Sequence, residues 1–237
     1  MRTPTRPRND VRQYDDLVGE WWRPAGRFAM LAWIAAARGR LVPPASRPGA
    51  ILVDLGCGGG LLAPHVAGKG YRHVGVDLVR SALELARDHR VTPVQADVTR
   101  LPLADGCADV VSAGELLEHV TDLPATVSEV CRIMRPGGTV VIDTLADTAL
   151  CRFLAISVAE RVPGGAPRGI HDPDLFVDPK ALGAEFARHG VALRTRGLRP
   201  QVRGLLRWLV TRRGAAPMVP TRSTAVLYQA VGTREVS

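Results

Sequence analysis

Residues 50–60, AILVDLGCGGG, decide the fold of this chain. The first half is a short apolar run that ends in an acid, which is typical of a buried parallel strand. The second half places glycines at 56, 58 and 60, where the backbone can turn sharply and a ligand can approach without meeting a Cβ atom. A helical pattern follows over residues 61–67. This order predicts a ligand site at the carboxyl end of the first strand.

Strand and helix patterns then alternate at short intervals, which favours βαβ units and one parallel sheet. Further strands are expected at 73–77, 93–97, 108–113 and 139–145, with helices at 81–90 and from residue 121 or 122. Helices at 151–162 and 179–189 and a late antiparallel strand pair, 191–198 and 225–232, complete the chain. We therefore expect an α/β fold with a mostly parallel seven-stranded sheet, helices on both faces and an N-terminal helical extension.

The chain shows no composition break that would divide it, so we expect a single domain over residues 1–237. Residues 1–13 are expected to form a flexible tail and residues 14–49 a helical cap, divided near Pro24 and Gly26. Residues 50–145 form the expected cofactor-binding core, and residues 146–237 a substrate-side insert with the final strands.

Composition excludes several classes of protein. With 46% hydrophobic and 23% charged residues, the chain is neither disordered nor fibrous. Four cysteines without a CxxC pair indicate neither a zinc knuckle nor a disulfide framework. The longest uncharged apolar run, residues 28–37, is too short to span a bilayer, and the N-terminus shows no secretory pattern. We expect a cytoplasmic protein.

The formal net charge of +8 is confined to the ends of the chain. Residues 50–185 contain 12 basic and 18 acidic residues, whereas residues 186–237 contain ten arginines and one glutamate. This distribution disfavours nucleic-acid binding, although a non-catalytic or nucleic-acid-binding module stays open as an alternative.

Two features indicate which ligand the glycine turn holds. Asp77 ends the second strand, 17 residues beyond Gly60, where a carboxylate can bind ribose hydroxyls. The turn reads GxGxG and follows Asp54, whose charge would repel a pyrophosphate. The ammonium and sulfonium groups of S-adenosylmethionine are cationic, so this cofactor suits the turn better than a dinucleotide.

At this point the sequence resembles the class I S-adenosylmethionine-dependent methyltransferases, which have a Rossmann-like fold. The matching motifs are VDLGCGGG (53–60), GVDL (75–78), QAD (95–97) and RPGG (135–138). The resemblance implies that Asp77 holds the ribose, that Asp97 and Val98 bind the adenine, and that the glycines border the methionine portion. The cofactor contacts expected in this way are Asp54, Gly56, Cys57, Gly58, Gly60, Asp77, Leu78, Asp97, Val98 and Gly114.

A closer resemblance, to the ubiquinone-biosynthesis O-methyltransferases, rests on EWW (20–22), ELLEH (115–119) and GIHD (169–172). It implies methylation of a phenol, catechol or hydroquinone hydroxyl, on a prenylated quinol or an aromatic natural product. A small-molecule N- or C-methyltransferase is the nearest alternative. In that family an arginine of the second N-terminal helix contacts the cofactor, and counting from the paired tryptophans this chain has Trp33 at that place.

Glu115, Glu118 and His119 would share one face if they lay on a helix, and could then hold a divalent cation such as Mg²⁺. The resemblance supports such an ion. The alternative is an acidic helical turn with His119 packed on the sheet. Methylation of a phenol needs a base, so either His119 or His171 is the expected catalytic residue, or the ion lowers the pKa of the phenol.

Residues 203–213, RGLLRWLVTRR, interleave apolar side chains with four arginines. Such a segment can lie in a membrane interface, with its arginines toward anionic headgroups. More often such a segment is a solvated helix or insert whose apolar face packs on the core. A peripheral contact at the inner face of a membrane is the alternative that this segment leaves open.

Overall fold

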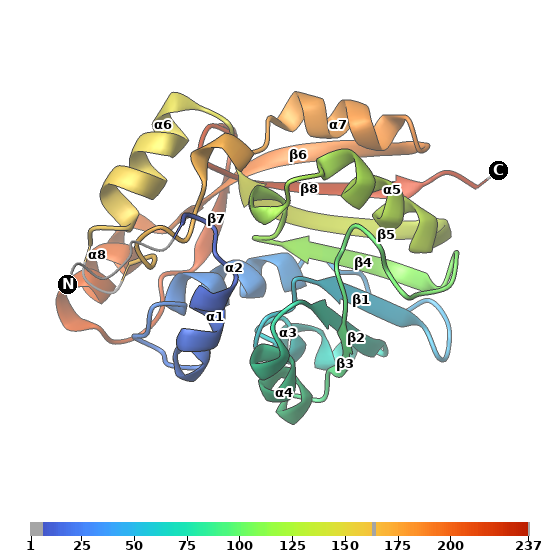
Figure 1. The fold of residues 1–237 in the computed structure, drawn as a ribbon, viewed down its shortest axis with the longest axis horizontal. Coiled ribbons are helices and arrows are strands. Elements are labelled where there is room, and N and C mark those ends of the chain that lie inside the picture. Colours follow the sequence, from blue (N-terminus) through green and yellow to red (C-terminus); the bar gives the residue numbers. More distant parts are fainter. Residues whose placement is uncertain (1–6, 163–164, 237) are drawn as a thin grey trace.

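The computed structural model describes residues 7–162 and 165–236. Its centre is one twisted sheet with the strand order β3-β2-β1-β4-β5-β8-β6-β7 (Figure 1). Strands β1 to β5 run parallel, and β8, β6 and β7 complete the sheet in antiparallel pairs. The bounds are β1 Ile51–Leu55, β2 Arg72–Asp77, β3 Thr92–Gln95, β4 Ala108–Gly114, β5 Met134–Leu145, β6 Val191–Pro200, β7 Met218–Thr221 and β8 Leu227–Arg234.

Helices cover both faces of the sheet. Alternate residues of β1 point to opposite sides: α5 and α7 pack on the face that carries Val53 and Leu55, and α3 packs on the face that carries Leu52. Asp122 begins α5 by accepting a hydrogen bond from the backbone of Ala125 at 2.9 Å. The helices are α1 Arg12–Asp16, α2 Ala29–Gly39, α3 Ala63–Val66, α4 Arg80–Asp88, α5 Leu123–Ile133, α6 Ala149–Arg152, α7 Pro179–Ala187 and α8 Val202–Thr211. A π-helical segment, Phe153–Ala159, continues α6, and short 3₁₀ turns occupy Val18–Glu20, Ala67–Lys69, Leu117–His119 and Pro173–Leu175.

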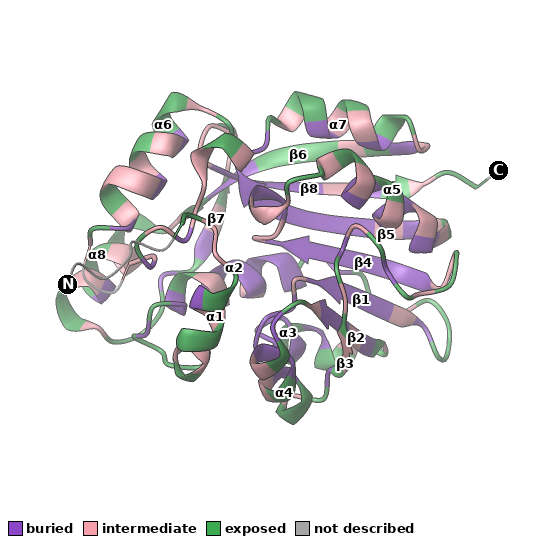
Figure 2. Ribbon diagram, viewed as in Figure 1, coloured by how far each residue is buried: buried purple, intermediate pink, exposed green. Residues whose placement is uncertain are grey.

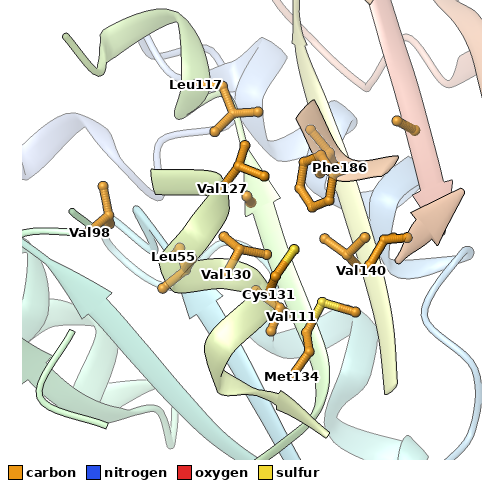
Figure 3. Close-up of a cluster of buried hydrophobic side chains, with 14 of the residues drawn as sticks. Leu55, Val98, Val111, Leu117, Val127, Val130, Cys131, Met134, Val140 and Phe186 are labelled. Carbon is orange, nitrogen blue, oxygen red and sulfur yellow. The ribbon is translucent and has the colours of Figure 1, made fainter. Parts of the chain in front are cut away.

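The main core lies between the sheet and the helices α5 and α7. Figure 3 shows Val127, Val130 and Cys131 of α5 among the side chains of the central strands, with Phe186 of α7 close by. Strand β4 is buried along its whole length, so Figure 2 shows the middle of the sheet as buried and the outer helix surfaces as exposed. This apolar burial stabilises the sheet and fixes where its carboxyl edge lies.

The expected fold class is confirmed, including the late antiparallel strands. The sheet has one strand more than the seven expected, because the short edge strand β7 gave no alternating pattern and contains Pro220. The helix expected at 151–162 is the α6 helix with its π-helical continuation.

The N-terminal segment differs from the expected tail. Residues 1–6 lie outside the described part of the chain, but residues 7–13 lie against the segment that follows β5. The backbone N–H of Asn9 and the side chain of Gln13 both donate to the carbonyl of Gly169, at 2.9 and 3.1 Å. Hydrogen bonds to a segment 156 residues away therefore hold this part of the N-terminus in place.

Candidate functional site

The glycine turn after β1 has the conformation that its sequence requires. Gly56, Gly58 and Gly60 have φ angles of +63°, +49° and +82°, a region that L side chains rarely adopt. A Cβ atom at Gly58 would lie 2.1 Å from the ring of Trp21, and one at Gly60 would lie 3.1 Å from the backbone of Ala86. Gly58 therefore lets Trp21 cover the turn, whereas Gly60 lets α4 pack against it.

The acids at the ends of β2 and β3 lie beside this turn. Asp77 accepts hydrogen bonds from the backbone N–H groups of Gly58 and Val79, at 2.8 and 2.9 Å. Burial raises the pKa of Asp77 against these hydrogen bonds. Asp97 is held by Thr99, whose backbone N–H and hydroxyl both donate to one carboxylate oxygen. Two oriented carboxylates thus follow neighbouring parallel strands at one edge of the sheet.

A cavity of about 280 Å³ opens between these acids and the N-terminal helices. Five of the expected cofactor contacts line it: Gly56, Asp77, Leu78, Asp97 and Val98. Its other walls include the aromatic rings of Tyr14 and Trp21, and the side chains of Glu115 and His119. The volume lies just below the roughly 300 to 1,000 Å³ that ligand sites usually have.

The remaining expected contacts, Asp54, Cys57, Gly58, Gly60 and Gly114, are not among the residues that line this cavity. Asp54 is buried, with its carboxylate 3.6 Å from Nε2 of His73. The thiol of Cys57 lies in an apolar cluster, and burial raises its pKa well above the usual value, so it is no nucleophile at neutral pH. Gly58 and Gly60 serve the packing already described.

Gly114 lies against Arg38, a residue that the sequence analysis did not identify. A Cβ atom at Gly114 would lie 1.6 Å from the guanidinium of Arg38 on α2. This buried guanidinium donates to Asp143 at 2.6 Å, in an ion pair whose side chains are 8% and 0% exposed. Although burial works against the charge, Asp143 and Asp54 raise the pKa of Arg38 above its usual value. Arg38 therefore carries its charge in the protein interior beside Gly114.

Buried carboxyl groups surround this arginine and make the site acidic. Burial, and then Glu118, raise the pKa of Glu115 well above its usual value. Burial raises the pKa of Glu118 to about 7, against a hydrogen bond from Thr144 at 2.7 Å. Three of these carboxyl groups have one oxygen without a hydrogen-bond partner among the described residues: Glu115, Glu118 and Asp143. A cationic ligand group would offset this excess of carboxyl groups.

The two candidate histidines stack on each other, with ring centroids 5.6 Å apart. Both ring nitrogens of His119 already have partners, since Nδ1 is 2.7 Å from Oδ1 of Asn9 and Nε2 is 3.3 Å from the hydroxyl of Tyr14. Burial, and then His171, lower the pKa of His119 to about 3, so it is neutral at pH 7. His171 lies outside the set of cavity-lining residues and contacts the cavity through His119.

Comparisons with known proteins agree with this geometry. The family model described as a methyltransferase domain matches residues 53–142. The chain is 34% identical over 201 residues to the ubiquinone biosynthesis O-methyltransferase of Bordetella bronchiseptica, covering 77% of this chain and 79% of that protein. The Ralstonia nicotianae protein of the same name is 36% identical over 209 residues, with 83% of each chain covered. The chain belongs to the same family as these two relatives.

A solved structure supports the same fold. The S-adenosylmethionine-dependent methyltransferase from Thermotoga maritima, described as a possible histamine N-methyltransferase, superposes with a TM-score of 0.66. It covers 94% of this chain and 98% of its own at 18% identity, which is a likeness of fold. Together with the family relatives, this makes the protein a methyltransferase.

Two expectations need correction in this family context. Trp33 does not take the place of the arginine, because it packs edge-on against Trp208, with ring centroids 5.2 Å apart. The buried arginine of the second N-terminal helix is Arg38, further along the same helix. The sequence signal was present, since a charged residue within the apolar run of α2 demands a buried partner.

The expected metal-binding set does not form. Glu115 precedes the 3₁₀ turn with a φ of +50°, so Glu115, Glu118 and His119 share no helix face. His119 is instead bound to Asn9 and Tyr14, and the described residues contain no group of three acidic, histidine or cysteine side chains able to hold a metal. These residues therefore do not fit a divalent cation in the way that the resemblance implies.

Proposed function

We propose that this methyltransferase transfers a methyl group from S-adenosylmethionine to the hydroxyl of a catechol- or hydroquinone-type ring. The observation that carries the proposal is the cavity at the carboxyl ends of β1 to β4, acidic in its lining and adjoining the histidine pair. The names of the relatives support a quinol-type acceptor, because their proteins act in ubiquinone biosynthesis.

The cofactor is proposed to lie along the strand ends. Asp77 would bind the ribose hydroxyls, and Asp97 with the backbone of Val98 would bind the adenine. The sulfonium and ammonium groups would then lie toward the buried carboxyl groups of Glu115 and Glu118, where positive charge is favoured. Arg38 is proposed to face the cofactor's carboxylate, since its guanidinium borders Gly114.

The acceptor must lose a proton, because a phenol with a pKa of about 10 is a poor nucleophile at neutral pH. His171 is the better base of the two histidines, since both nitrogens of His119 are already bound. The phenolic oxygen attacks the methyl carbon in line with the carbon–sulfur bond, whose electrons stay on sulfur. The protein's remaining task is to align oxygen, carbon and sulfur.

Methyl transfer tests the proposal directly. The protein is incubated with S-adenosylmethionine and a catechol, a hydroquinone or a hydroxynaphthoquinone, and each acceptor is analysed by mass spectrometry. We expect a mass gain of one methyl group on oxygen. Methylation at nitrogen or carbon, or no transfer to any hydroxyl under saturating cofactor, would overturn the O-methylation proposal.

Helix α8 supports a second proposal, a peripheral contact with the inner face of a membrane. Trp208, Leu205 and Leu209 pack inward, so the apolar surface of α8 that faces solvent is Val202, Leu206 and Val210, which are 57%, 58% and 84% exposed. Exposed arginines flank these side chains and would meet anionic headgroups. None of the helices in the described ranges has the length and apolarity to cross a bilayer.

Vesicle sedimentation tests this contact. We expect the protein to bind vesicles that contain phosphatidylglycerol better than neutral vesicles, and the double variant Leu206→Asn/Val210→Asn to lose this binding. Val236→Asn changes an equally exposed apolar side chain elsewhere and is the matched control. Equal binding by the double variant and the control would refute the assignment of α8.

A further inference from the structure

Glu160 is a buried acid that neither the motifs nor the cofactor site uses. Its side chain is 4% exposed and lies at the end of the π-helical segment after α6. The guanidinium of Arg8 binds both of its oxygens, at 3.0 Å each, and the backbone N–H of Gly169 donates to Oε2 at 2.9 Å. Burial raises its pKa, but His171, Gly169 and Arg8 outweigh this and lower it. Glu160 is therefore an anion at neutral pH.

The imidazole of His171 faces this anion. Its Nδ1 lies 3.7 Å from Oε1 of Glu160, too far for a hydrogen bond, and has no hydrogen-bond partner among the described residues. The backbone of His171 is held in place, because Arg8 also donates to the carbonyl of His171 at 2.8 Å. Phe176 meets the ring edge-on, and His119 stacks on it. A small movement would bring Nδ1 into contact with Glu160.

We propose that Glu160 is a positioning residue for methyl transfer, which holds His171 as the Nδ1–H tautomer and thereby leaves Nε2 to accept the proton of the substrate hydroxyl. This inference rests on the proposed role of His171. A carboxylate beside one imidazole nitrogen fixes the tautomer and the ring orientation, and it stabilises the imidazolium that forms.

The step balances without another reactant. The O–H bond of the phenol breaks and its proton passes to Nε2 of His171, while a new bond joins the phenolic oxygen to the methyl carbon. The carbon–sulfur bond breaks and leaves neutral S-adenosylhomocysteine. The positive charge lost by the sulfonium therefore resides on His171, beside the negative charge of Glu160. Hydrogen bonds of this kind are commonly long in the free enzyme and shorten when substrate binds.

A purely structural role for Glu160 is the competing explanation, since its pair with Arg8 joins the N-terminal segment to the insert. The two roles make different predictions. If Glu160 is a structural clamp, its substitution changes stability and cofactor affinity. If it is a positioning residue, its substitution changes the His171 tautomer and the rate of the chemical step. The tests below use readouts that separate them.

The first test is independent of activity. Long-range ¹H–¹⁵N spectra of the ¹⁵N-histidine-labelled full chain report the tautomer of each of its six histidines, and the variant His171→Gln assigns the resonance. We expect His171 to be the Nδ1–H tautomer in the native protein and to shift toward Nε2–H in Glu160→Gln. An Nε2–H tautomer in the native protein, or no change in the variant, would overturn the proposal.

The second test is kinetic. Glu160→Gln should lower kcat by about tenfold to a hundredfold while the KM for S-adenosylmethionine changes less than about twofold. In the His171→Gln background the same substitution should lower kcat no further, because Glu160 acts through that imidazole. Independent, additive losses in the double variant would show a structural role instead.

Asp109→Asn is the matched control, since Asp109 is also a 4% exposed acid, held by Arg47 and Arg135. It lies near the start of β4, at the opposite edge of the sheet from the cavity. This variant should leave kcat within about twofold of native and leave the His171 resonances unchanged. Calorimetry with S-adenosylhomocysteine shows whether each variant retains the cofactor site. If the native protein methylates no hydroxyl, the proposed function fails, and the tautomer result still decides whether Glu160 orients His171.

Discussion

Replacing Arg38 by methionine should destabilise the protein strongly and in a pH-dependent manner. The substitution keeps much of the side-chain volume but removes the guanidinium that pairs with Asp143 at 2.6 Å. Removing one partner of a buried ion pair costs about 3 to 5 kcal/mol, because the other charge stays buried without compensation. For a chain of this length, that cost corresponds to a melting temperature lower by roughly 6 to 20 °C.

The cost should grow as the pH rises. The pKa of Asp143 is already raised above its ordinary 3.8 by burial, and the loss of Arg38 would raise it further. A carboxyl group whose folded pKa exceeds its unfolded value contributes stability at low pH and loses that contribution as the pH rises through the folded pKa. Below its unfolded pKa, Asp143 is protonated in both states. Arg38→Met should therefore cost little near pH 4 and most near pH 8.

Urea denaturation of the native protein and the variant at pH 4.5, 6 and 8 measures this difference. Arg38→Lys, which keeps the charge, should recover part of the loss. Arg80→Met is the matched control, because Arg80 forms an exposed pair with Glu84 on α4, and such pairs contribute less than about 1 kcal/mol. A cost for Arg38→Met below about 1 kcal/mol, or one that does not change with pH, would refute the buried-pair reasoning.

Three further results are expected, two at the site and one on α5. Asp77→Ala should weaken S-adenosylhomocysteine binding about tenfold or more in calorimetry, and unchanged affinity would refute the ribose contact. Gly58→Ala should destabilise the fold in urea by more in the native background than in Trp21→Ala, because the new methyl group would meet that ring; equal costs in both backgrounds would contradict the contact. The pKa of Glu129 is lowered by its hydrogen bond from Arg132, so Glu129→Gln should lose stability above pH 4.5 and little below it; a loss that is the same at pH 3.5 and pH 7 would contradict the ion pair.

Local sequence was sufficient to predict the structure wherever a backbone conformation admits essentially one type of residue. The positive φ angles of Gly56, Gly58 and Gly60 follow from a strand that turns at once into a helix, and the acids Asp77 and Asp97 follow from strand ends. Short apolar runs also placed the parallel strands, because the strands of a sheet covered on both faces are apolar along their length. These signals lie within a few residues of one another.

The reasoning failed where a side chain depends on a partner far away in the chain. The spacing of Glu115, Glu118 and His119 fits a helix, but Asn9 and Tyr14 hold the histidine in a 3₁₀ turn. No local pattern indicates such a partner, because it lies more than a hundred residues away.

The amino-acid sequence by itself determined the sheet, the glycine turn and the acids that follow the strands, since hydrophobic periodicity and backbone conformation are local properties. Only the tertiary structure brought Arg38 to Asp143 and Glu160 to Arg8 and His171. Buried charges need partners of opposite charge, and the chain supplies them from distant segments whose approach is set by packing.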